Sequence, residues 1–154
     1  VGKINAAYHL FKGIQKFSPD IIINLGTAGS TLFNRGEVVC CNQFIQRDMD
    51  VRALGFKNFE TPFSNGEIIL NYGLEIEKLP KGICGSGDQF EMEHNNHEYN
   101  VIEMEAYALA KVCKEENLPF LSLKYISDGA DGNAVEDWQT EVKKAALSLK
   151  KVLF

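Results

Sequence analysis

The chain has 154 residues, of which 45% are hydrophobic and 24% are charged, and its formal net charge is −5. This length fits one domain with a sizeable core, and the acidic balance argues against a nucleic-acid partner, which needs concentrated lysine and arginine. No apolar run approaches membrane-spanning length, and we expect neither a signal peptide nor a membrane partner. The four cysteines lie in strand-like or helical settings, which favours buried, reduced thiols in a cytoplasmic protein.

The first third of the chain predicts one helix followed by two strands. Apolar residues recur at helical spacing through residues 3–17, and Ser18-Pro19 ends this predicted helix. The β-branched run at residues 21–23 predicts a strand buried on both faces. Small residues and glycines follow at 24–30, where the backbone could approach a ligand, although a plain tight turn explains this segment equally well. Residues 36–45 predict the second strand.

The middle of the chain carries weaker signals. Residues 47–56 form a loop that is too apolar to lie freely in water, so we expect it to pack against its own domain or against a partner subunit. Asn65-Gly66 predicts a turn. Residues 67–76 are expected to be extended, and residues 82–86 predict a short strand.

The segment 91–100 is short and polar and contains two histidines. His94 and His97 have acidic neighbours, but their spacing matches no established metal-ligand pattern. We therefore expect a solvated loop and no metal.

The last third of the chain alternates strands and helices. A short apolar run at 101–102 precedes a helix that ends at Asn117-Leu118-Pro119, and residues 120–126 predict another strand. Apolar residues then recur at helical steps from 135 to 152. Such alternation indicates a single α/β domain with three layers, covering residues 1–154.

Three carboxylates follow the two C-terminal strand-like runs. Glu103 and Glu105 come directly after the run at 101–102, and Asp128 follows the run at 120–126. If these runs are neighbouring parallel strands, the carboxylates meet at one edge of the sheet. In open α/β sheets, ligands bind at that edge.

Five segments of this chain occur in the order seen in the nucleoside phosphorylase superfamily. They are INLGTAGS (23–30), RDMDVRALGF (47–56), GSGDQF (85–90), VIEMEA (101–106) and KYISDGAD (124–131). Within that superfamily the chain resembles the bacterial 5′-methylthioadenosine/S-adenosylhomocysteine nucleosidases. The resemblance implies a three-layer αβα fold with a central mixed sheet, hydrolysis of the bond between adenine and ribose, no cofactor, and a role in methionine salvage.

The resemblance assigns the acid of this reaction to Asp128. Adenine is a poor leaving group, so a carboxyl that keeps its proton near neutral pH must protonate the purine at N7. Ser127 resembles the residue that orients this aspartate. Taken alone, an aspartate before Gly129 would be an ordinary turn residue.

The resemblance assigns the ribose to the EME segment. Glu105 resembles the carboxylate that accepts hydrogen bonds from the ribose hydroxyls and favours a positively charged transition state. Met104 is expected to pack against the ribose. Glu103 fits a supporting position, and capping of the following helix together with Asn100 is equally compatible with the sequence.

The base and the nucleophile are assigned in the same way. Phe90 is expected to stack on the purine. Glu91 occupies a position where the family usually carries an apolar residue beside the backbone groups that read the base, so base preference stays open. Thr27, Ala28 and Gly29 resemble the turn that faces the ribose and the attacking water.

The loop at 47–56 resembles a segment that crosses to a second subunit. It implies a homodimer in which Val51 and Leu54 line the partner's pocket for the 5′-substituent of a purine nucleoside. Trp138 aligns with an aromatic residue that caps this pocket, although a core position on the last helix explains it equally well.

Two further positions bear on the nucleophile. Asn24 occupies the place of the arginine that holds phosphate in the phosphorylases, which favours water as the nucleophile. Lys124 replaces the usual arginine of the family. The family's N-terminal strands, with the glutamate that activates the water, are expected upstream of Val1.

Two alternative functions remain open. One is another nucleosidase or phosphorylase, such as a futalosine-type hydrolase, and the other is a nucleoside-binding protein without turnover.

Overall fold

The computed structural model describes residues 1–65 and 67–154. Its elements in chain order are α1 (Lys3–Phe17), β1 (Ile22–Gly29), β2 (Val38–Gln46), the 3-10 helix η1 (Arg52–Leu54), β3 (Leu70–Asn71), β4 (Lys81–Ser86), β5 (Val101–Glu103), α2 (Ala106–Glu115), β6 (Phe120–Asp128) and α3 (Ala134–Leu153).

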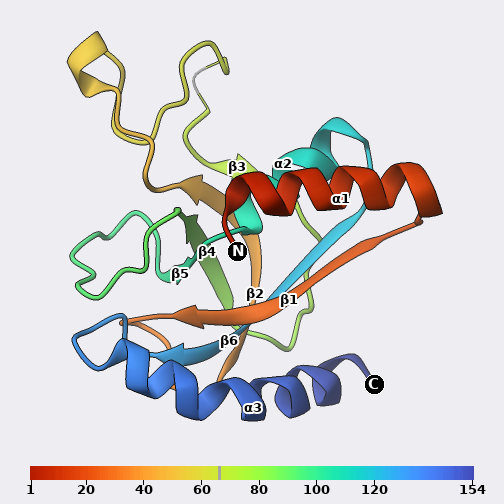
Figure 1. The fold of residues 1–154 in the computed structure, drawn as a ribbon, viewed down its shortest axis with the longest axis vertical. Coiled ribbons are helices and arrows are strands. Elements are labelled where there is room, and N and C mark those ends of the chain that lie inside the picture. Colours follow the sequence, from red (N-terminus) through yellow and green to blue (C-terminus); the bar gives the residue numbers. More distant parts are fainter. Residues whose placement is uncertain (66) are drawn as a thin grey trace.

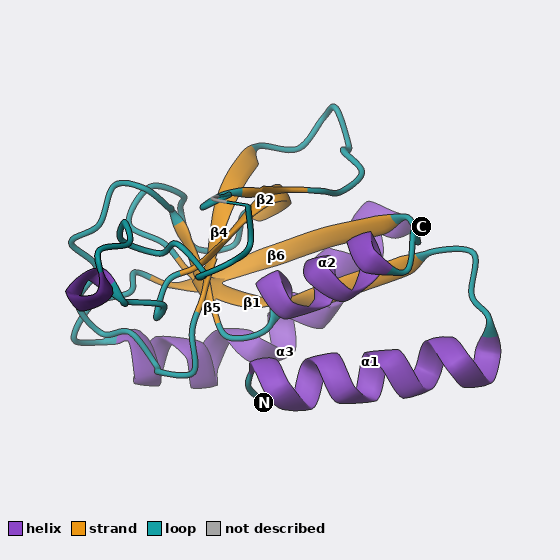
Figure 2. Cartoon of the chain, turned by 90° about the horizontal axis from the view of Figure 1, so that it is seen from above, coloured by secondary structure: helices purple, strands orange, loops and turns teal. Residues whose placement is uncertain are grey.

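A mixed sheet lies between two helical layers (Figure 1). Helices α1 and α2 pack against each other on one side, and α3 packs on the other side against β6 and β1. Figure 2 shows the same helices and strands from above. The predicted three-layer αβα fold with a central mixed sheet is confirmed.

The sheet closes on itself. Its strand order is β3-β2-β4-β5-β1-β6, and the first half of β2 also pairs with β6. The pairings β2–β4, β4–β5 and β1–β6 are parallel, whereas β1–β5 and β2–β6 are antiparallel. Five strands therefore form a closed ring of pairings, and β3 extends it at β2.

Strands β5 and β6 are not neighbours, so the condition on which the sequence brought the carboxylates together is not met. Strand β1 lies between them, because Gly29 pairs with Ile102 of β5 on one side and with Asp128 of β6 on the other. This shared pairing at Gly29 brings the ends of all three strands together. The carboxylates thus meet at one edge although another strand separates β5 from β6.

Strand β6 forms the centre of the core, since all nine of its residues are buried. The rings of Phe44 and Phe120 pack with their centroids 5.7 Å apart. Burial of such a side chain stabilises the fold by roughly 1.5–3 kcal/mol. The four cysteines are buried and free, as predicted: Cys40, Cys41, Cys84 and Cys113.

Strand β1 differs from its prediction. It was expected to be buried on both faces, yet Ile23 and Leu25 are 45% and 44% exposed. Helix α3 packs more closely against β6 than against β1. In the described part of the chain, one face of β1 is therefore only partly covered.

The segment that precedes β4 is mostly irregular. Of the predicted extended stretch 67–76, only β3 pairs as a strand. The predicted turn at Asn65-Gly66 includes Gly66, which lies outside the described residues. The loop that carries η1 extends away from the sheet (Figure 1).

Among the described helices, none is both long enough and apolar enough to cross a bilayer.

Candidate active site

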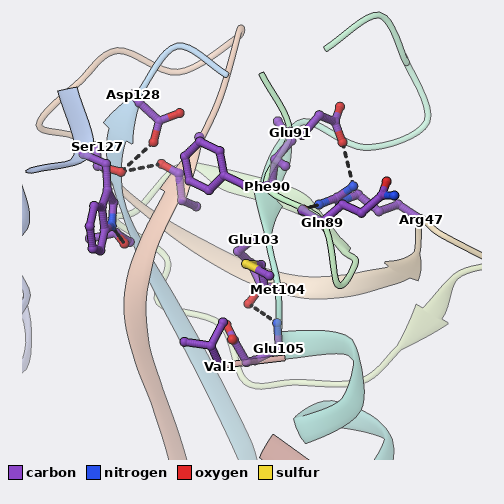
Figure 3. Close-up of a pocket in the computed structure, with 15 residues that line it drawn as sticks. Val1, Arg47, Gln89, Phe90, Glu91, Glu103, Met104, Glu105, Ser127 and Asp128 are labelled. Carbon is purple, nitrogen blue, oxygen red and sulfur yellow. Dashed lines mark hydrogen bonds and ion pairs between the residues drawn. The ribbon is translucent and has the colours of Figure 1, made fainter. Parts of the chain in front are cut away.

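A cavity of about 330 Å³ opens at the carboxyl ends of the strands. Thr27, Ala28 and Gly29 end β1, and Ser127 and Asp128 end β6. The other lining residues are Val1, Arg47, Gln89, Phe90, Glu91, Ile102, Glu103, Met104, Glu105 and Trp138. Figure 3 shows how separate segments converge on this space. Such an edge is the usual ligand site of α/β folds.

Asp128 lies at the cavity wall, and its carboxylate accepts hydrogen bonds from two neutral donors. Ser127 Oγ donates to Oδ2 at 2.8 Å (Figure 3), and the Ala130 N–H donates to Oδ1 at 3.0 Å. A Cβ atom on Gly29 would lie 2.5 Å from Oδ1. A side chain at position 29 would collide with this carboxylate, so Asp128 can lie against the end of β1 only because Gly29 has no Cβ atom.

The surroundings of Asp128 favour its protonated form. Burial raises the pKa of this carboxyl, and the negative charges of Asp137 and Asp131 raise it further, while the hydrogen bonds from Ser127 and Ala130 lower it. The net shift is upward. A carboxyl with a raised pKa retains a proton closer to neutral pH and can act as a general acid.

Glu103 is also buried but is fully paired. Its carboxylate accepts hydrogen bonds from Lys124 Nζ at 3.0 Å, from Ser86 Oγ, and from the backbone N–H groups of Glu105 and Ala106 at 2.9 and 2.8 Å. Burial raises the pKa of Glu103, but the Lys124 ammonium and these donors outweigh burial, and the pKa is lowered. Glu103 is therefore an ionised support beneath the site.

The two predicted roles of Glu103 are compatible in the structure. It receives the N–H of Ala106, the first residue of α2, and so satisfies a free donor at the start of that helix. Asn100 does not share this role, because its Oδ1 accepts the Ile83 N–H at 2.9 Å. The cap fixes the start of α2 and, with it, the position of Glu105.

Glu105 faces the start of α1. Its Oε1 accepts the Gly2 N–H at 2.7 Å, and Val1 lines the cavity beside it. Met104 lies next to Glu105 on the same wall (Figure 3). The start of the chain and the junction between β5 and α2 therefore meet at the wall to which the resemblance assigns the ribose.

Glu91 directs its carboxylate toward Arg47, which follows β2, and toward His94 of its own loop. Its Oε2 lies 2.9 Å from Arg47 Nη1, and its Oε1 lies 2.6 Å from His94 Nδ1. The side chain of His94 is only 2% exposed. The prediction of a solvated loop is thus wrong for His94, while His97 is exposed. No group of three metal-binding side chains is found among the described residues.

Trp138 lies at the rim of the cavity rather than in the core. Its Nε1–H donates to Thr27 Oγ1 at 3.0 Å, and 40% of the residue is exposed. This hydrogen bond ties the first turns of α3 to the end of β1. The alternative prediction of a core aromatic is wrong.

Two predicted site residues lie elsewhere. Val51 and Leu54 do not line this cavity, and Leu54, in η1, is 73% exposed. They were expected at the pocket of a second subunit, which remains a prediction.

Sequence reasoning missed several lining residues. Arg47 directly follows β2, so its place after a predicted strand was a usable signal, as it was for Asp128. Gln89 adjoins the predicted Phe90. Val1 and Ile102 carried no such signal, because only the packing of α1 and β5 brings them to the cavity.

The comparisons with known proteins agree with this geometry. A sequence model of the phosphorylase superfamily matches residues 1–154. A 5′-methylthioadenosine/S-adenosylhomocysteine nucleosidase from Staphylococcus saprophyticus is 30% identical over 173 residues, covering 99% of this chain and 76% of that protein. The chain belongs to the 5′-methylthioadenosine/S-adenosylhomocysteine nucleosidase family of the phosphorylase superfamily. The family predicted from the sequence is confirmed.

Solved structures of nucleosidases have the same fold. The crystal structure of the Neisseria meningitidis enzyme, in complex with methylthio-immucillin-A, is 27% identical with a TM-score of 0.83, covering 96% of this chain and 73% of that one. The Helicobacter pylori enzyme, with butyl-thio-DADMe-Immucillin-A, has a TM-score of 0.91 at 24% identity and covers 99% and 74%. At that lower identity the likeness concerns the fold alone.

Proposed function

We propose that this nucleosidase-family protein hydrolyses the N-glycosidic bond of 5′-methylthioadenosine, S-adenosylhomocysteine or both, and releases adenine. The observation that carries the proposal is Asp128, a buried carboxyl with a raised pKa, in one cavity with Phe90 and Glu105. A proton donor, an aromatic face and an anionic acceptor are the groups that cleavage of a purine nucleoside requires. The proposal is also supported by the related proteins, which are 5′-methylthioadenosine/S-adenosylhomocysteine nucleosidases.

Each residue has a distinct part in this reaction. Phe90 stacks on the purine, and Asp128 donates its proton to N7 as the bond to ribose breaks. Ser127 orients Asp128 through its 2.8 Å hydrogen bond. Glu105 accepts hydrogen bonds from the ribose hydroxyls, and its negative charge stabilises the cationic sugar that forms. Met104 packs against the ribose.

Water is the proposed nucleophile. Asn24 replaces the phosphate-binding arginine of the phosphorylases and accepts a hydrogen bond from Ser122 Oγ at 3.1 Å. Arg47 lines the cavity, but its guanidinium is engaged by Glu91 and by the carbonyl of Gln89. A phosphate ion would therefore have to compete for this cation. A glutamate upstream of Val1 that activates the water stays a prediction.

We also propose that the protein acts as a cytoplasmic homodimer in methionine salvage. The exposed Leu54, with Val51, would contact the 5′-substituent pocket of a second copy, and the extended loop around η1 would cross to it. Four buried, reduced cysteines suit a reducing compartment. Analytical ultracentrifugation of the wild type and of Leu54→Asp tests the dimer, and a wild-type monomer would exclude it.

The enzymatic proposal is tested by adenine release from 5′-methylthioadenosine with and without phosphate. Release that is independent of phosphate is the expected result. Phosphate-dependent release would identify a phosphorylase. Release from futalosine alone would move the substrate to another nucleoside, and binding without release would leave a nucleoside-binding protein.

A further inference from the structure

Helix α1 begins beside the cavity without a capping side chain of its own. Its first turn contains no acidic residue, and Lys3 is preceded by Gly2, which has a φ of 93°. The first N–H groups of a helix have no partner within the helix. Figure 3 shows Val1, directly before this start, next to Glu105. The start of α1 therefore depends on acceptors from other segments.

Two carboxylates from distant segments accept these N–H groups. The Gly2 N–H donates to Glu105 Oε1 at 2.7 Å, and the Lys3 N–H donates to Asp88 Oδ1 at 2.8 Å. The helix dipole also favours negative charges at this end of α1. Two successive amides of one helix start thus join Glu105 on the cavity wall to Asp88 after β4.

The side chain of Lys3 stabilises the same junction. Its Nζ lies 2.5 Å from Asp48 Oδ2 and 3.3 Å from Asp88 Oδ2. Asp48 Oδ2 also accepts the Asp88 N–H at 2.9 Å, so it fixes the backbone of the loop that carries Asp88. We call Lys3, Asp48 and Asp88 the latch. The latch joins α1 to the segments that follow β2 and β4.

The latch is charged and partly shielded from water. The side chain of Lys3 is only 13% exposed. Burial raises the pKa of Asp48, but the hydrogen bonds from Lys3 and from the Asp88 N–H outweigh burial, and the pKa is lowered. A Cβ atom on Gly2 would lie 3.0 Å from Asp88 Oδ1, so the glycine leaves the space that this carboxylate occupies. These contacts hold the start of α1 more firmly than an isolated surface ion pair would.

The consequence for the cavity lies at Glu105. Gly2 holds its Oε1, and no hydrogen bond to its Oε2 is found among the described residues. An acceptor for the ribose hydroxyls works best when its direction is fixed before the ligand arrives. We propose that Lys3, Asp48 and Asp88 are positioning residues that act through the start of α1 to direct Glu105 at the ribose. This inference rests on the proposed function, because it takes Glu105 as the ribose acceptor.

The test compares kcat/KM for 5′-methylthioadenosine with that for its 3′-deoxy analogue. The ratio of the two values measures the gain from the 3′-hydroxyl, and comparing ratios between variants cancels the intrinsic reactivities of the two nucleosides. Glu105→Ala should lower the ratio at least about tenfold, the scale of a hydrogen bond to a charged group. Asp88→Ala keeps Glu105 but releases the start of α1, and should lower the ratio about fivefold.

Three further variants separate positioning from general damage. Asp88→Asn keeps an oxygen for the Lys3 N–H and should hold the ratio within about twofold of the wild type. Asp88→Ala added to Glu105→Ala should lower the ratio no further, because the latch acts through Glu105. Glu37→Ala is the matched control: it removes a carboxylate that accepts a different backbone N–H, that of Asn34 at 2.8 Å, and should leave the ratio unchanged.

A purely structural role of the latch gives a different result. Asp88→Ala would then slow both nucleosides by the same factor and leave the ratio unchanged, which would overturn the proposal. A further fall in the double variant, or a ratio in Asp88→Asn as low as in Asp88→Ala, would also overturn it. If Asp88→Ala does not fold, as judged by thermal melting, Lys3→Met replaces it and should lower the ratio in the same way; an unchanged ratio there refutes the latch.

Failure of the proposed function is distinguishable from failure of the latch. An unchanged ratio in Glu105→Ala would refute the ribose assignment and the latch together, whereas an unchanged ratio in Asp88→Ala alone refutes only the latch. A wild type that cleaves neither nucleoside would refute the reaction. The ratio is then measured from calorimetric affinities for the two nucleosides, where a lower ratio in Asp88→Ala supports the latch and an equal ratio, or no binding by the wild type, refutes it.

Discussion

Two buried carboxyl groups in this protein have opposite ionisation behaviour. Glu103 and Asp128 are 6% and 4% exposed and lie at the ends of β5 and β6. Burial is the largest influence on both, and it raises the pKa of each. Yet the pKa of Glu103 is lowered overall, and that of Asp128 is raised.

The largest influence that lowers the pKa of Glu103 is one cation, which Asp128 lacks among its described contacts. Lys124 lies 3.0 Å from Glu103, and each residue stabilises the charged form of the other. The described contacts of the Asp128 carboxylate are with neutral donors. Burial alone therefore does not make a carboxyl an acid catalyst; burial without a counter-charge does. One carboxyl supports the fold, and the other is the group that we propose for proton transfer.

The largest effect is expected from Asp128→Asn. An amide cannot donate a proton to N7 as an acid does, so kcat should fall by about 10²–10⁴-fold, the usual contribution of a general acid. Binding of 5′-methylthioadenosine, measured by calorimetry, should change little. Turnover at the wild-type rate would exclude Asp128 as the acid.

The same variant should gain stability at neutral pH. Because the pKa of Asp128 is raised in the fold, the folded state holds the proton more tightly than the unfolded state, and stability falls as pH rises through the folded-state pKa. The amide of Asp128→Asn has no proton to lose in this pH range, so the variant does not lose stability in this way. Thermal melting across pH should show a higher melting temperature above that pKa, while Asp20→Asn, an exposed control far from this site in the sequence, shows none.

Removal of the Lys124 ammonium should destabilise the fold, because it leaves the charge of Glu103 buried without a partner. Lys124→Met leaves Glu103 buried without its partner, which typically costs about 3–5 kcal/mol. Urea unfolding measures this loss, and adding Glu103→Gln should recover much of it. If the single and double variants are equally unstable, the charge of Glu103 is not the cause. In the wild type, the lowered pKa of Glu103 means that its contribution is lost as pH falls through that pKa.

Ser127→Ala tests how the hydrogen bond from Ser127 affects the ionisation of Asp128. The hydroxyl lowers the pKa of Asp128, so its removal should raise that pKa and move the alkaline limb of the kcat profile to higher pH. At neutral pH kcat should still fall about tenfold because the acid is less well oriented. A pH–rate profile without a shift would argue against this contact.

The smallest effect is expected at the rim. Trp138→Phe keeps the aromatic ring but loses the 3.0 Å hydrogen bond to Thr27. A half-exposed hydrogen bond contributes about 1 kcal/mol, so KM should rise about fivefold with kcat nearly unchanged. Thr27→Val should give the same rise, and the double variant should add nothing. A large fall in kcat instead would assign Trp138 to the chemical step.

Local patterns explain which parts of the fold were predicted. The helical spacing of residues 3–17 gave α1 with its observed bounds, and strand ends followed by small or acidic residues located Gly29, Glu103 and Asp128. The exposure of Ile23 was not predicted, because a β-branched run indicates a strand but not what covers it.

The sequence by itself determined the family, the elements and the chemical types at the site. The tertiary structure alone decided how those groups behave. Lys124 sets the charge of Glu103 from another strand, Arg47 holds Glu91 from the end of β2, and β1 separates β5 from β6. Periodicity reports contacts between near neighbours along the chain, whereas ionisation depends on charges that are close only in space.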